Sequence, residues 1–154
     1  MTIRGLFGDR RRTWRGAFVV VLACIVAVVV AGCAGGARQV SSGPVVSVTE
    51  RDFQISADAG HVAPGAVVLR IHNAGPDQHE LIVVPGGSQG LPFRTDGFTV
   101  NEEAIQRSEL GSIAPQRPGG TEDVRVHLGP GRYLLFCNMA GHFMSGMHAE
   151  LVVR

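Results

Sequence analysis

The 154-residue sequence contains no lysine, so all 14 of its Lys-plus-Arg positions are arginine. Five of these arginines and one of the 13 acidic residues lie in residues 1–32. The rest of the chain therefore carries nine arginines and twelve acids, a net charge of −3 with histidine neutral. Because no basic patch is left there, nucleic-acid binding is not expected. The weak acidity instead favours solubility.

Cysteine is also scarce, with three in the whole sequence. Cys24 lies inside an apolar N-terminal run, and Cys33 follows that run. If the run is removed and Cys33 is modified, Cys137 is the only free thiol left, and no internal disulfide can form. A bare thiol in an oxidising compartment is open to oxidation, which a bound metal would prevent. A buried, inert cysteine is the alternative, but the neighbours of Cys137 favour a metal.

The N-terminal segment has the pattern of a secretion signal. Five arginines precede an almost wholly apolar run over residues 17–31, which is short for a membrane span. The run ends in Val-Ala-Gly before Cys33, and this sequence resembles a bacterial lipoprotein cleavage site. By that resemblance, residues 1–32 are a lipoprotein signal peptide and Cys33 is the lipidated first mature residue. An uncleaved membrane anchor is the alternative.

Both interpretations place the rest of the chain outside the cytoplasm and tethered to a membrane, in the periplasm or on the outer face of the cytoplasmic membrane. The arginines at 10–12 before Trp14 are a twin-arginine candidate, although an ordinary positive segment is the preferred interpretation. Residues 33–44 are rich in Gly, Ala and Ser, a composition typical of a flexible tether.

From residue 45 onward, short β-like runs alternate with Gly and Pro turns. The run 79–84 is apolar on both faces after its first residues, so we expect both faces to be covered. Within the Gly- and Pro-rich segment 85–120, Thr99 and Glu102 fit a capping box for one short helix that ends near Gly111. The pattern predicts an all-β Greek-key sandwich over residues 45–154 with one short helix. Its strands are expected in 45–56, 66–73, 79–84, 121–128, 132–137 and 148–153.

Four side chains form a candidate metal site. Cys137, His142 and Met147 lie within eleven residues, directly after an expected strand, and His79 stands at the head of another. Two imidazoles, a thiolate and a weakly bound thioether are the ligands of a mononuclear blue-copper site. Soft sulfur with imidazole excludes Mg²⁺ and Ca²⁺ and admits copper or zinc.

Three motifs resemble the cupredoxin family of type 1 blue copper proteins: NAGPDQHELIV at 73–83, PGRYLLFC at 130–137 and CNMAGHFMSGM at 137–147. The long ligand loop is similar to rusticyanin-like and sulfocyanin-like members. The resemblance implies a cupredoxin domain with one type 1 copper ion. His79, Cys137 and His142 would be its equatorial ligands and Met147 its axial ligand. It also implies single-electron exchange with transient redox partners, and we expect a monomer.

Two residues beside the ligands depart from the family pattern. Glu80 stands where many members have Asn or Ser. Asn138 stands where many members have Thr or Ser. In the family these neighbours join the two ligand loops by hydrogen bonds, and we expect Glu80 and Asn138 to make an equivalent tie. Around His142, the resemblance implies an apolar rim of Ala140, Phe143 and Met144 for partner docking. Ordinary loop packing is the alternative for Phe143.

Other histidines and methionines compete for the same roles. Met144 lies only two residues past His142, which would strain a shared coordination, so Met147 is the preferred axial ligand. His148 is either a surface residue or a second metal contact, and the surface is preferred. The three remaining histidines are expected at the surface: His61, His72 and His127.

The preferred function is an extracytoplasmic, membrane-tethered copper protein that carries single electrons. A copper carrier or chaperone is the alternative, because additional soft methionines and His148 suit Cu(I). An enzyme is not expected, since the sequence has no His-x-His pair for further copper centres and only one cysteine in the ligand loop. A metal-free adhesive sandwich would leave the ligand set unexplained.

Overall fold

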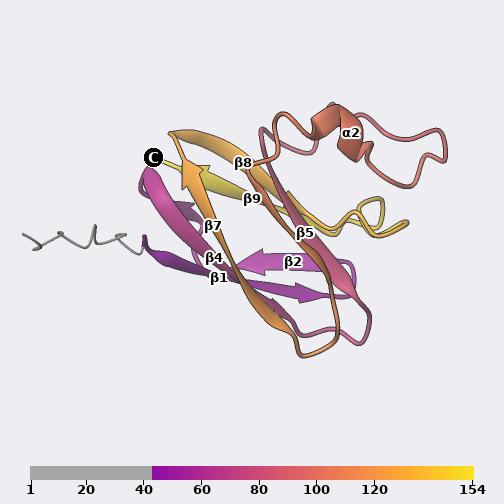
Figure 1. The fold of residues 1–154 in the computed structure, drawn as a ribbon, viewed down its shortest axis with the longest axis horizontal. Coiled ribbons are helices and arrows are strands. Elements are labelled where there is room, and N and C mark those ends of the chain that lie inside the picture. The colour runs from indigo at the N-terminus through magenta and orange to yellow at the C-terminus, as the bar shows by residue number, and fades with distance from the viewer. Residues whose placement is uncertain (1–42) are drawn as a thin grey trace, which may run out of the picture. The chain divides into compact units, whose positions relative to one another are not determined.

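A computed structural model of the chain describes residues 43–154. The expected signal peptide, Cys33 and most of the expected tether lie outside the described residues. The described part folds as two β-sheets that pack face to face, with one short helix beside them (Figure 1). Within this part, no helix is long and apolar enough to cross a membrane. The predicted all-β sandwich with one short helix is confirmed.

The first sheet has four strands in the order β2-β1-β4-β7. Strand β1 runs parallel to β4, and the other two pairs are antiparallel. The expected strand 45–56 is in fact two strands, because the chain reverses at Asp52 and Phe53 and β2 folds back on β1. The bounds are β1 Val45–Arg51, β2 Gln54–Ala57, β4 Gly65–Asn73 and β7 Thr121–Leu128.

The second sheet has five strands in the order β3-β9-β8-β5-β6. Its two edge strands, β3 and β6, were not predicted from the sequence. Strand β3 has only two residues, and β6 contains a proline and only one buried apolar side chain, Ile113, so neither has a clear strand pattern. The bounds are β3 His61–Val62, β5 His79–Pro85, β6 Gly111–Gln116, β8 Gly131–Phe136 and β9 His148–Val153.

Two apolar clusters cover the two faces of the five-stranded sheet. The larger cluster fills the sandwich and includes Leu81 and Val83 of β5. The smaller cluster lies on the outer face, where Ile82 and Val84 of the same strand pack with residues of the segment between β5 and β6. The predicted burial of β5 on both faces is therefore confirmed. The partners on the outer face are Leu91, Val100, Ile105, Leu134, Phe136 and Phe143.

The short helix α2, Glu102–Ile105, begins differently from the prediction. Its N-cap is Asn101, whose side-chain oxygen accepts a hydrogen bond from the N–H of Ala104. Thr99 instead donates its hydroxyl to Asp96, so the predicted capping box is wrong. Gly111 is not the end of the helix but the first residue of β6. The short side chains at 96, 99 and 101 all suit caps and turns, and sequence alone did not separate them.

The sandwich interior contains one unpaired acidic side chain. On β1, Val46, Val48 and Glu50 alternate inward, and Glu50 is fully buried. Neither of its carboxyl oxygens has a hydrogen-bond partner in the described part of the chain. Burial, with a smaller contribution from Glu80, raises the pKa of Glu50 from 4.5 to about 8. The folded protein therefore holds Glu50 protonated at neutral pH.

The Glu50→Gln variant tests this assignment. Because the folded state keeps a proton that the unfolded chain releases above its ordinary pKa, stability falls as pH rises toward the folded pKa. Between about pH 6 and about pH 9, the copper-free parent should lose roughly 2–3 kcal/mol of unfolding free energy more than E50Q does. Urea unfolding followed by circular dichroism measures both profiles. Parallel profiles would show that Glu50 does not titrate in this range.

Candidate metal centre

His79 is held at the start of β5 by the loop that precedes it. The buried side chain of Asn73 organises this loop. Its amide nitrogen donates to the carbonyls of Asp77 and Gln116 at 2.8 and 3.0 Å, and its oxygen accepts from Gly75 N–H at 3.0 Å. His79 is fully buried at the end of this loop. The Asn-x-Gly-x-x-x-His motif thus fixes an imidazole at one end of the sandwich.

Cys137 directly follows β8 and opens the loop that returns to β9. Its backbone N–H donates to the carbonyl of Met147 at 3.1 Å, so the two ends of the loop are joined. Inside the loop, His142 N–H donates to the Met139 carbonyl at 2.9 Å, and Met147 N–H donates to the His142 carbonyl at 3.0 Å. These backbone bonds hold His142 over Cys137.

The structure brings the three predicted equatorial ligands together. The candidate ligand atoms of His79, Cys137 and His142 all lie within 4.8 Å of one another. The Cys137 Sγ atom is 3.5 Å from His142 Nδ1, and the two imidazole rings are 5.2 Å apart. Met147 is fully buried in the same apolar cluster as Cys137, whereas Met144 is 59% exposed.

The buried nitrogens of His79 suit a metal. Neither ring nitrogen has a hydrogen-bond partner within residues 43–154, and a fully buried polar group rarely lacks one. Burial and the neighbouring His142 lower the pKa of His79, while Asp52 acts in the opposite direction. The imidazole is therefore neutral at neutral pH, which is the form that binds metals.

Cys137 is a protonated thiol in the copper-free fold. Burial raises its pKa from 9.0 to about 11. Backbone N–H groups of Glu80 and Met139 donate to the sulfur and partly offset this effect. These two donors are placed to stabilise a thiolate, so Cys137 could hold a metal as a thiolate after losing one proton.

Glu80 and Asn138 do lie against each other. The backbone N–H of Asn138 donates to the Glu80 carboxylate and partly offsets the rise in the pKa of Glu80 that burial and Glu102 cause. The Asn138 side chain also accepts from Val100 N–H at 2.6 Å and donates to the Val100 carbonyl and to Glu102 Oε1 at 3.0 and 2.7 Å. The sequence did not indicate this second attachment, which joins the ligand loop to the segment between β5 and β6. The effect of Glu80 and Asn138 on the metal stays a prediction.

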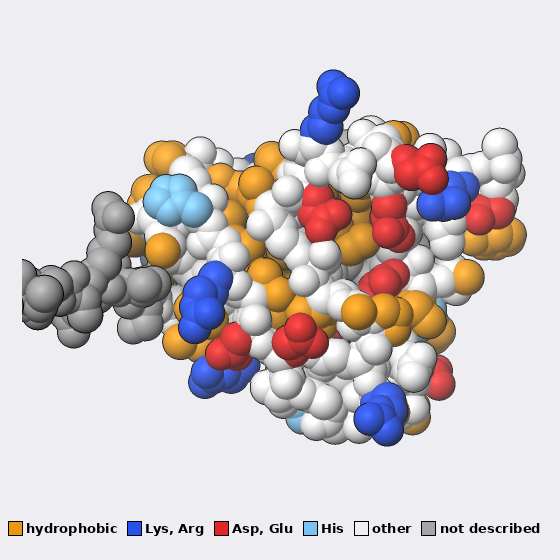
Figure 2. Space-filling model, viewed as in Figure 1, with side chains coloured by type: hydrophobic (Ala, Val, Ile, Leu, Met, Phe, Trp, Pro, Cys, Tyr) orange, Lys and Arg blue, Asp and Glu red, His pale blue; other side chains and the backbone are white. Residues whose placement is uncertain are grey.

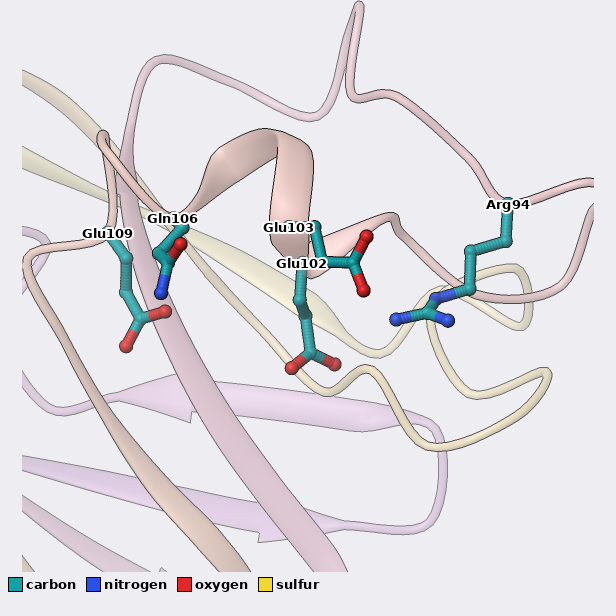
Figure 3. A pocket seen from close by; sticks show the side chains of 5 residues that line it. All are labelled: Arg94, Glu102, Glu103, Gln106 and Glu109. Carbon is teal, nitrogen blue, oxygen red and sulfur yellow. The ribbon is translucent and has the colours of Figure 1, made fainter.

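Glu102 also lines a surface pocket beside α2. Figure 3 shows this pocket, with carboxylates from Glu102, Glu103 and Glu109 on the helix side and the guanidinium of Arg94 across from them. Acidic side chains gather over the same region in Figure 2, with apolar side chains between them. The pocket is polar and acidic, and it belongs to the outer surface rather than to the ligand cluster.

The surface around His142 differs from the prediction at one position. Ala140 and Met144 are exposed, but Phe143 is buried, so its place in an exposed rim is wrong and the alternative, ordinary loop packing, is confirmed. The Phe143 ring packs edge-on against Phe136 at 5.5 Å and completes the outer apolar cluster. The His148 ring lies 5.2 Å from Phe143 and outside the ligand cluster.

Phe53 takes a place in this surface that the sequence did not indicate. Its half-exposed ring meets His142 edge-on at 5.3 Å, from the turn between β1 and β2. An unbroken strand was expected over 45–56, and the turn at Asp52 and Phe53 was therefore missed. This turn is what brings the Phe53 ring to His142. The predicted surface positions of His61, His72 and His127 are confirmed.

Comparisons with solved structures find the same fold in auracyanins and in rusticyanin. Auracyanin from the photosynthetic bacterium Roseiflexus castenholzii is 20% identical, covers 73% of this chain and 98% of its own, and has a TM-score of 0.55. Auracyanin A from Chloroflexus aurantiacus, described as a "blue" copper protein, is 22% identical over 73% of this chain and 100% of its own, with a TM-score of 0.53. Reduced rusticyanin is 16% identical over 73% of this chain and 81% of its own, with a TM-score of 0.51.

No family model matches the sequence, and no curated protein matches it. The structural similarities establish the fold. The ligand residues come from the coordinates of this chain: His79, Cys137 and His142 form the cluster, and Met147 is buried in the same core as Cys137. The chain therefore has a cupredoxin-like fold with the two-histidine, cysteine and methionine arrangement of a type 1 copper site.

Proposed function

We propose that this protein carries single electrons between redox partners through one copper ion held by His79, Cys137 and His142, with Met147 as the axial ligand. The observation that carries the proposal is the buried cluster of three ligand atoms within 4.8 Å, together with the unpartnered nitrogens of His79. When bound, copper would supply one-electron Cu(II)/Cu(I) chemistry.

The residues around the cluster suit that role because the fold already positions them. Cys137 is held by β8 and by its backbone bond to Met147, and two further N–H groups donate to its sulfur. A site set by the fold changes little in geometry when the charge of its ion changes, which favours rapid electron exchange. The buried thiol offers no accessible nucleophile, so we do not propose an enzyme.

His142 supplies the route to the surface. Its ring is half-buried, and the exposed side chains of Ala140, Met144 and Phe53 lie on or beside its loop. A small apolar surface of this kind suits brief docking of a redox protein rather than a permanent complex. We propose that partners dock there and that the protein works as a monomer.

We further propose that the protein works outside the cytoplasm, tethered to the membrane by a lipid on Cys33. The support is the sequence pattern of residues 1–32 and the small residues before Cys33. The Cys33→Ala variant tests it. With the lipid attachment lost, the protein should leave the membrane fraction or stay as uncleaved precursor, whereas the parent should take up radiolabelled fatty acid. A parent that takes up no label would contradict lipidation.

Copper binding is tested by adding Cu(II) to residues 34–154. A thiolate–Cu(II) site should give an intense visible band and narrow copper hyperfine splitting in the paramagnetic spectrum. The Cys137→Ser variant is the matched control and should lack both signals because it has no thiolate. A parent domain that stays colourless would contradict the proposed site.

A copper carrier is the alternative, and exchange kinetics separate the two. The extra methionines favour it, since Met139 packs, partly buried, against the apolar cluster that contains Cys137, and Met144 is exposed. An electron carrier should lose copper slowly to a competing chelator and keep its visible band during the experiment. Fast loss without the band would favour the carrier.

Replacing Met147 should have much more effect than replacing Met144. Met147 is fully buried beside Cys137, while Met144 is mostly exposed. An axial ligand tunes the reduction potential of a blue copper site, so Met147→Leu should shift the potential and the absorption spectrum. Met144→Leu is the matched control and should leave both nearly unchanged. Voltammetry and optical spectra of the two variants measure these effects. A larger effect of Met144→Leu than of Met147→Leu would make Met144 the axial ligand.

A further inference from the structure

The turn between β1 and β2 contacts both histidines of the cluster. Asp52 Oδ1 lies 3.5 Å from His79 Nε2, and the ring of the next residue, Phe53, meets His142 edge-on. The sheet register brings the turn to this place, since Arg51 pairs with Gln54 and leaves only Asp52 and Phe53 between the strands. No ligand comes from this turn, yet it covers two of the three ligands.

The backbone of the turn is strained at Phe53, the residue directly after Asp52. Phe53 has φ of 58°, and it is the only residue other than glycine with positive φ in the described range 43–154. A bulky side chain in the left-handed region is unfavourable and persists only where the surroundings enforce it. Such strain often accompanies function, and here it lies beside the ligand cluster.

Gly75 leaves the space that the carboxylate needs. A Cβ atom at position 75 would lie 2.8 Å from Asp52 Oδ1 and 2.9 Å from His79 Nε2, too close to both. Gly75 is in turn fixed by its N–H bond to the buried Asn73 side chain. The loop before His79 is therefore shaped so that Asp52 and the His79 nitrogen can approach each other.

An imidazole that binds a metal through one nitrogen usually donates the N–H of its other nitrogen to a carboxylate or a carbonyl. At 3.5 Å, the Asp52–His79 pair is longer than a hydrogen bond, and Nε2 is otherwise without a partner. The Asp52 side chain is 36% exposed, so it has room to close the remaining distance, whereas His79 is fully buried.

We propose that Asp52 is a positioning residue for His79: it accepts the Nε2 proton and thereby leaves Nδ1 as the metal-binding atom. The consequence for copper rests on the proposed function, but the choice of tautomer does not. Its negative charge also favours the more highly charged oxidised ion. Asp52 therefore lowers the reduction potential and strengthens the binding of Cu(II).

Nitrogen-15 spectra of the copper-free, full-length chain in detergent, labelled at histidine, test the tautomer directly. In the parent, His79 should carry its proton on Nε2. In Asp52→Ala, that preference should be lost, and the proton should exchange faster with solvent. Asp52→Asn keeps an acceptor oxygen without the charge, so it should retain the tautomer.

Copper-loaded chains give the second measurement. Asp52→Ala should bind Cu(II) about 10–100-fold more weakly. A tenfold loss confined to the oxidised form raises the potential by about 59 mV. The matched control is Asp77→Asn, which removes an exposed carboxylate that acts on His79 only through its charge. Its effect on affinity and potential should be smaller, with the tautomer unchanged.

The outcomes separate this inference from the proposed function. If His79 keeps its Nε2 proton in Asp52→Ala, or if Asp77→Asn matches Asp52→Ala in both measurements, Asp52 does not position the ligand. If the parent binds no copper but the tautomer still depends on Asp52, the proposed function fails and the assignment of Asp52 stands. Circular dichroism of each variant checks that the fold is intact, and Asp52→Leu, which also lacks an acceptor, replaces Asp52→Ala if the latter does not fold.

Discussion

The backbone hydrogen bond from Cys137 to the carbonyl of Met147 closes the ligand loop, and the geometry of the whole site depends on this closure. It places the end of β8 next to the start of β9, so that the loop between them must turn back over Cys137. His142 is then held above the sulfur by bonds within the loop, and Met147 is drawn into the sandwich core. The ligand loop is thus closed by backbone hydrogen bonds, whereas His79 is positioned by the side chain of Asn73 in the loop before it.

Burial sets the protonation states of Cys137 and His79. The low-polarity surroundings keep Cys137 protonated and His79 neutral in the copper-free protein. The backbone N–H groups of Glu80, in β5, and of Met139, in the ligand loop, both donate to the sulfur. The site is therefore prepared for a thiolate before any metal arrives.

Much of the fold could be predicted from the sequence, because alternation and turn residues mark β4, β5, β7, β8 and β9 well. The ligand cluster could be predicted too, since the type and spacing of the donor residues can be recognised in the sequence without knowledge of packing. Edge strands could not, because β6 contains a proline and buries only Ile113 among its apolar residues. The contacts of Asp52 and Phe53 also escaped prediction, since a turn within an apparent strand depends on tertiary packing. The burial of Phe143 was only the alternative to an exposed rim, because the packing of one loop aromatic cannot be read from its neighbours in sequence.

The two attachments of Asn138 have a consequence for any attempt to move this site into another protein. Its backbone faces Glu80 of the sandwich, while its side chain forms three hydrogen bonds to Val100 and Glu102 of the segment between β5 and β6. The segment between β5 and β6 thus holds the ligand loop in place through these hydrogen bonds. A graft that transplanted only residues 137–147 would leave a buried amide without partners and a loop free to drift from its histidine. The smallest transferable unit therefore includes the whole stretch from β5 to β9.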